Sequence, residues 1–137
     1  MLHLIPSSAL GGRLDEAKAI AASAPSEPVP TIAGRISLFW KLALHGEREE
    51  ATSCFGEHLL ACARNVEFWA KAVADCYAFI GDRTLALEWL ETAVRQGYLH
   101  YPYFSSRSLI WRRFDSDPEF QALMRDVKAG WEQLQQV

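Results

Sequence analysis

Apolar residues recur along the chain at the three- and four-residue spacing of amphipathic helices, and glycines interrupt the pattern. In the stretch YAFIGDRTLALEWLETAV, residues 77–94, Gly81 separates two apolar runs, and Ala86, Leu90 and Ala93 follow it at offsets of five, nine and twelve. This spacing predicts one helix on each side of Gly81. Because glycine readily adopts the left-handed conformation that ends a helix, we expect a tight turn there.

The same arrangement occurs twice upstream, after Gly12 and Gly46. The three glycines are 34 and 35 residues apart. The residue five places after each glycine is an alanine: Ala17, Ala51 and Ala86. The residues at offsets nine and twelve are Ala21 and Ala24 in the first block and Phe55 and His58 in the second. Acidic residues follow each glycine, where they favour the first turn of a helix. The second and third blocks therefore each predict a helix, a turn and a second helix. The first block predicts only a second helix, about residues 12–24, because Pro6 would break a full first helix.

This repeat resembles the tetratricopeptide repeat, a 34-residue helix–turn–helix unit with a small residue and a tyrosine in its first helix and a series of small and large contact residues in its second. Residues 67–100 match best, with Ala74, Tyr77 and Gly81 at the small, tyrosine and turn positions. The preceding block matches less well, because Phe39 stands where a small residue is usual and His58 replaces the last alanine. We expect wider helix packing there.

The resemblance implies a single all-α domain, a right-handed α-solenoid of antiparallel helix pairs. Its parts would be a partial repeat at residues 9–31, repeats at 32–66 and 67–100, and capping helices at 101–137. Within the cap we expect a short helix from about Phe104 to Phe114. Ser116 or Asp117 can cap the last helix, with Pro118 near its first position. The apolar stripe of that helix consists of Phe120, Leu123, Met124, Val127, Trp131 and Leu134.

The composition argues against several classes of protein. The chain has 137 residues, a net charge of -3 and a pI of about 5.8. This acidic balance does not indicate a protein that binds nucleic acid. No apolar run approaches the ~18 residues of a membrane span. Three cysteines without a Cys-x-x-Cys motif indicate reduced thiols in a cytoplasmic protein. Cys54 and Cys62 are expected on one helix, too far apart for a disulfide, and we expect both to pack in the core.

The sequence contains no motif that indicates catalysis or a cofactor. It lacks a glycine-rich phosphate loop and a Gly-x-Ser-x-Gly elbow, and its histidines do not have the spacing of a metal site. We therefore expect no enzyme activity, no metal and no cofactor. One alternative stays open, a small helical enzyme or metal-binding protein that uses His45, His58 and a carboxylate.

If the chain is a solenoid, the resemblance implies that the first helix of each pair lines a concave groove that binds a peptide. The candidate partner-binding residues are Trp40, Phe68, Lys71, Asp75, Phe79 and Arg112. Aromatic anchors mixed with charge are typical of a binding surface, and the polar members are too polar for a core. The alternatives are burial of Trp40 and Phe79 between units and a solvated face for the charged residues.

A basic cluster of Arg107, Arg112 and Arg113 adjoins Trp111. It could bind an acidic peptide tail or a carboxylate. The alternative is a solvated helix face on which the arginine stems cover apolar surface.

Taken with the resemblance, these patterns predict a non-enzymatic protein–protein interaction module in the cytoplasm, binding a peptide or a partner domain. The resemblance also implies the C-terminal part of a larger bacterial regulatory or signalling protein. A helical array that begins within a repeat leaves the apolar face of its first helices uncovered. We therefore expect either that another part of a longer protein precedes this chain or that its N-terminal edge binds a partner. The alternative function is therefore a structural element that self-associates through this edge, and such pairing would make the chain a homodimer.

Overall fold

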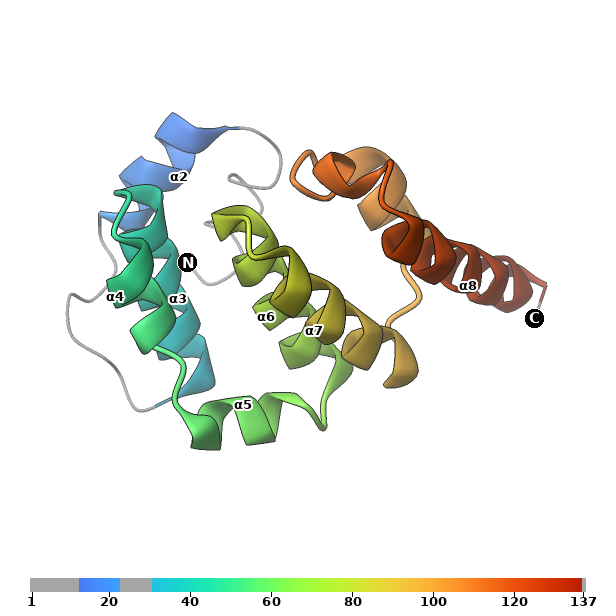
Figure 1. Ribbon diagram of the computed structural model, residues 1–137, viewed down its shortest axis with the longest axis horizontal. Coiled ribbons are helices and arrows are strands. Elements are labelled where there is room, and N and C mark those ends of the chain that lie inside the picture. The colour runs from blue at the N-terminus through green and yellow to red at the C-terminus, as the bar shows by residue number, and fades with distance from the viewer. Residues whose placement is uncertain (1–12, 23–30, 137) are drawn as a thin grey trace.

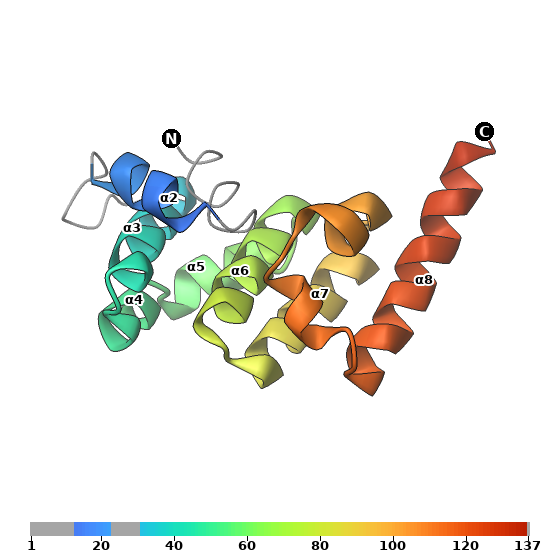
Figure 2. The ribbon, with the colours of Figure 1, turned by 90° about the horizontal axis from the view of Figure 1, so that it is seen from above.

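The computed structural model describes residues 13–22 and 31–136, apart from the side chains of residues 106 and 107. Every regular element in this part of the chain is a helix, which confirms the all-α class there. The elements follow one another in a row from α2 at one end to α8 at the other (Figures 1 and 2). They are α2 (Leu14–Ala21), α3 (Ile32–Leu44), α4 (Arg48–Ser53), α5 (Glu57–Ala63), α6 (Glu67–Ile80), α7 (Arg83–Arg95), η1 (Tyr103–Arg107), η2 (Trp111–Phe114) and α8 (Pro118–Gln135).

The predicted turns at Gly46 and Gly81 have the same geometry. Both glycines are left-handed, with φ of 79° and 81°. The backbone N–H of the next residue donates to the carbonyl five residues before it, from Glu47 to Leu42 over 2.9 Å and from Asp82 to Tyr77 over 3.0 Å. This pairing satisfies carbonyls that the end of a helix leaves without partners. The turn at Gly81 folds α6 and α7 into a side-by-side pair (Figure 1). The turn predicted at Gly12 lies outside the described residues.

The small residues predicted at helix contacts are buried. Ala17, Ala51 and Ala86 have no exposed surface, and the same holds for Ala21, Leu90 and Ala93. Their equivalent Ala24 lies outside the described residues. The small alanine side chains allow two helix backbones to approach closely, and the larger Leu90 fills the space between Ala86 and Ala93, so these positions set how tightly the pairs pack.

The helix expected after Gly46 is broken, because α4 ends at Ser53 and α5 begins at Glu57. Cys54 and Cys62 therefore lie on different elements, and the prediction of one helix is wrong. Cys54 is buried, whereas Cys62 is exposed, so only Cys54 has the expected place in the core. The break accommodates Phe39, whose ring stacks on Phe55 with centroids 4.9 Å apart. Arg35 donates from Nη1 to the carbonyl of Cys54 over 3.3 Å, which satisfies a group that the break frees.

The segment from Phe104 to Phe114 is not one α-helix, as the sequence predicted, but a π-helical turn, η1, followed by the 3-10 turn η2. Phe104, Trp111 and Phe114 are all buried. The irregular backbone brings the Phe104 and Trp111 rings together, with centroids 5.8 Å apart. Asp117 caps α8 and Pro118 is its first residue, as predicted.

Candidate functional site

Lys71 and Asp75 lie one turn apart on α6 and form an enclosed ion pair. Nζ of Lys71 is 2.7 Å from Oδ2 of Asp75. The indole N–H of Trp111 donates to Oδ1 of Asp75 over 2.7 Å. Asp75 is 1% exposed, so the prediction that it is too polar for the core is wrong. Two charge-assisted contacts compensate for the cost of removing this carboxylate from water.

Two tyrosines cover this ion pair. Nζ of Lys71 lies 3.8 Å from the ring centroid of Tyr103 and 5.8 Å from that of Tyr98. Burial, and then the charge of Asp75, raise the pKa of both phenols well above the ordinary value of 10.0, so both stay neutral. The cluster fixes the segment after α7 against α6, and most of the Lys71 side chain is covered.

The other four predicted groove residues are divided between core and surface. Trp40 is 1% exposed, and its ring centroid lies 4.9 Å from that of the half-buried Phe79. This pair therefore follows the alternative of burial between helices. Phe68 is 41% exposed beside Trp69, and Arg112 is exposed on η2. The six residues thus do not share one open surface.

The histidines considered as metal ligands have separate surroundings. His58 is exposed on α5, with Nε2 3.9 Å from Sγ of Cys62. Nδ1 of His45 is 2.7 Å from the backbone oxygen of Lys41. Across the described ranges, no three side chains of histidine, cysteine, aspartate or glutamate gather as a metal-binding group.

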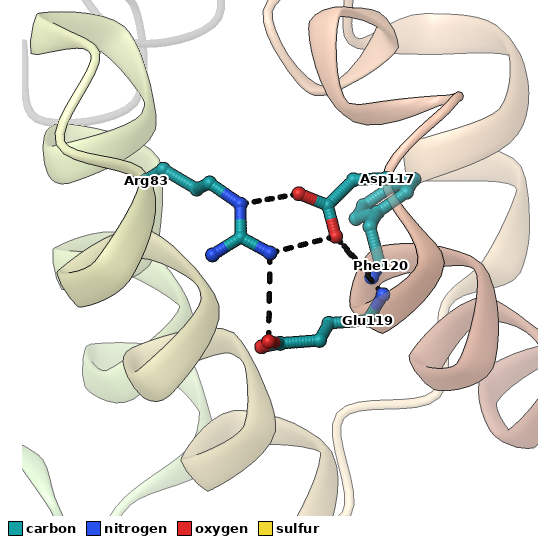
Figure 3. A network of polar contacts seen from close by, with 4 residues as sticks. All are labelled: Arg83, Asp117, Glu119 and Phe120. Atoms are coloured by element: carbon teal, nitrogen blue, oxygen red, sulfur yellow. Dashed lines mark hydrogen bonds and ion pairs between the residues drawn. The ribbon is translucent and has the colours of Figure 1, made fainter.

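An ion-pair network joins the first turns of α7 and α8 (Figure 3). Arg83 donates from Nε and Nη2 to the two carboxylate oxygens of Asp117, the Nη2 bond being 3.0 Å long. The carboxylate of Glu119 lies 3.5 Å from the same guanidinium. Oδ1 of Asp117 also accepts the backbone N–H groups of Glu119 and Phe120. One carboxylate therefore starts α8 and ties it to α7.

A groove of about 510 Å³ lies between α7 and α8 beside this network. We call it the α7–α8 groove. Each helix contributes one large apolar side chain to the lining, Leu87 from α7 and Leu123 from α8. The remaining lining residues are Arg83, Thr84, Glu88, Glu91, Glu119, Ala122 and Asp126. The groove thus combines an apolar strip with walls that carry four carboxylates and a single guanidinium.

A second pocket, of about 480 Å³, lies between η1 and α8, and we call it the η1–α8 pocket. Its aromatic residues include the buried Phe104 and Phe120. Two cations, Arg125 and Lys128, project from α8. Its other lining residues are Tyr101, Ser105, Asp115, Gln121 and Met124. Its charge balance is therefore opposite in sign to that of the α7–α8 groove.

Sequence reasoning missed both hollows, although α8 carries a signal for each. Glu119, Ala122, Leu123 and Asp126 recur at helical spacing, which places them on one face. Gln121, Met124, Arg125 and Lys128 likewise share a face, on the other side of the apolar stripe. The sequence predicted a cap with one apolar stripe on α8, whereas the charged flanks of that stripe form walls of the two hollows.

None of the described helices combines the length and the apolar character needed to cross a membrane. No family model, curated protein or solved structure matches the chain. The resemblance to the tetratricopeptide repeat consequently stays a prediction from sequence motifs.

Proposed function

We propose that the chain is a non-enzymatic protein-interaction module and that its partner binds in the α7–α8 groove. The observation that carries this proposal is the groove itself, which has an apolar strip, Leu87 and Leu123, between charged walls. An apolar centre with a polar rim is the usual anatomy of a protein interface. A groove between two helices is also a common binding site for the apolar face of an amphipathic helix.

The charges of the groove favour a basic partner. Four lining residues are acidic, and the one lining cation, Arg83, is already bonded to Asp117 and Glu119. Arg64 and Arg95 reach Glu88 and Glu91 through exposed ion pairs. Such pairs contribute little to stability, so a partner's lysine or arginine can replace them at small cost. The Asp126 side chain is exposed and forms no hydrogen bond or ion pair with any described residue, which leaves it available.

We also propose that the helix pairs form a right-handed solenoid related to the tetratricopeptide repeat. The matching turns at Gly46 and Gly81 and the buried alanines five residues after each support this architecture. Gly97 ends α7 with the same type of turn, since Tyr98 donates to the carbonyl of Ala93 over 3.0 Å. In a solenoid, such repeated turns stack successive units in one direction.

The test uses a synthetic amphipathic helical peptide with leucines along one face and lysines on both flanks, titrated into the full chain by calorimetry. We expect binding that weakens roughly tenfold or more in the double variant Glu91→Lys/Asp126→Lys, because reversing both charges turns two attractions for the lysines of the peptide into like-charge repulsion. Glu132→Lys adds positive charge on the same helix outside the groove and should leave the affinity nearly unchanged.

Equal weakening by the groove and control variants would show general charge attraction and would reject the groove as the site. A scrambled peptide of the same composition that binds equally well would reject the recognition of an amphipathic helix. Far-UV circular dichroism of each variant checks that the fold persists.

A further inference from the structure

The η1–α8 pocket differs from the α7–α8 groove in shape and in charge, and the proposed interaction function does not use it. Its base is aromatic, because Phe104 from η1 and Phe120 from α8 are both buried there. The half-buried side chains of Tyr101 and Met124 extend this apolar surface toward solvent. A flat or flexible apolar group placed against these four side chains would leave water on entering.

The cations of the pocket stand next to this apolar surface. The Arg125 side chain is exposed and forms no ion pair or hydrogen bond with any described residue. Nζ of Lys128 lies 6.0 Å from the ring centroid of Tyr101 and 4.0 Å from the carboxylate of Glu132, an exposed pair that holds it weakly. Asp115 is the one acidic residue of the lining. A guanidinium without a partner is well suited to bind a carboxylate through two parallel hydrogen bonds.

The dimensions of the pocket favour a small ligand over a chain. The α8 lining extends from Phe120 to Lys128, which is roughly 12 Å of helix. An extended peptide advances roughly 3.3–3.6 Å per residue, so only three or four residues would fit. The volume of about 480 Å³ lies within the range of small-molecule sites. The net charge of -3 and the acidic groove on the other side of α8 disfavour a long polyanion such as nucleic acid.

We propose that the η1–α8 pocket binds a small amphipathic carboxylate. The ligand's aromatic ring or short acyl chain lies against Phe104, Phe120 and Met124. Its carboxylate is bound by Arg125, with Lys128 as the second cation. This site is separate from the α7–α8 groove and does not depend on the proposed protein partner.

The experiment uses anilinonaphthalene sulfonate, an aromatic anion whose fluorescence rises in apolar surroundings, with the full chain at neutral pH. We expect saturable binding that phenylbutyrate and octanoate displace. Phenylbutylamine, which has the same ring and a positive charge, should not displace the probe. In Arg125→Glu the affinity for the probe and for phenylbutyrate should fall about tenfold or more, as expected for losing charged hydrogen bonds. Arg48→Glu makes the same charge change on α4 and should leave both affinities unchanged.

Displacement by the amine as effective as by phenylbutyrate, or equal losses in the two arginine variants, would overturn the proposal. An unchanged affinity in Arg125→Glu would overturn it as well. Stronger displacement by an acidic octapeptide or by a single-stranded oligonucleotide than by phenylbutyrate would replace the small carboxylate with that class of ligand. Thermal unfolding of each variant separates a lost site from a lost fold, and Arg125→Gln provides a second variant without a new negative charge.

Discussion

Asp75 shows how the neighbours of a charged side chain determine its place in the molecule. The carboxylate is buried between Lys71 on its own helix and the indole of Trp111, which is 36 residues away in the chain. Such a pair contributes little to stability compared with apolar packing, but the loss of one partner leaves the other charge uncompensated. This asymmetry makes Asp75 a sensitive position and makes Lys71 unsuitable as a probe of partner binding.

Asp75→Ala should destabilise the fold by roughly 3–5 kcal/mol, the usual cost of removing one member of a buried pair. Asp75→Asn keeps an acceptor for the Trp111 indole and should cost less. Urea unfolding followed by tryptophan fluorescence measures both. If the alanine variant unfolds at the same urea concentration as the wild type, the cluster does not secure the segment after α7.

Asp117 provides a second residue-scale test, through pH. Its hydrogen bond with Arg83 holds its pKa below the ordinary value of 3.8, and its bonds to the α8 backbone act in the same direction. The folded state therefore favours the ionised carboxylate, and this stabilisation is present above that ordinary value. It is lost as the pH falls through the lower pKa of the folded state.

Consequently, the free energy of unfolding of the wild type should fall more steeply below about pH 4 than that of Asp117→Asn, which cannot titrate at this position. Asparagine still caps the helix, so the two proteins differ mainly in charge. Urea titrations at neutral pH and at several acidic pH values measure the difference. Parallel curves for the two proteins would contradict an ionised Asp117 in the network.

At the scale of elements, the break between α4 and α5 has local and tertiary causes. Thr52 and Ser53 donate from their hydroxyls to the carbonyls three residues earlier, and such bonds compete with helix continuation. Gly56, which precedes α5, is a poor helix former. The stacking of Phe55 on Phe39 then stabilises the bent chain. The sequence predicted wider helix packing near Phe39, but periodicity alone could not show that the helix after Gly46 would be interrupted.

The contact between α6 and α7 gives an element-scale prediction. Ala86→Leu adds three carbons at a fully buried position and should cost roughly 1–3 kcal/mol by overpacking. Ala129→Leu makes the same change at an exposed site of α8 and should shift stability by less than about 0.5 kcal/mol. Thermal unfolding of both variants makes the comparison. Equal melting temperatures would mean that α6 and α7 do not approach closely at Ala86.

At the scale of the whole molecule, the features that followed from sequence are those set by neighbouring residues. Helical periodicity, the turns at Gly46 and Gly81 and the Asp117 cap all depend on local chemistry, and each was predicted. The hollows beside α8 depend on how far that helix stands from α7 and η1, which no local pattern determines. The burial of Asp75 likewise depends on Trp111, which lies in a segment with irregular backbone. The sequence predicted a regular helix there, so it could not place the indole beside this carboxylate.

Helix α8 forms one wall of both the α7–α8 groove and the η1–α8 pocket. A ligand that binds more tightly when α8 is displaced in one direction changes the shape available on the other side. If both proposals hold, occupation of the two sites is thermodynamically linked, and the linkage is reciprocal: a carboxylate that alters affinity for a basic helix is itself bound more or less tightly by the same factor. Because the Arg83 network fixes α8 at its first turn, such a displacement would pivot the helix about that end.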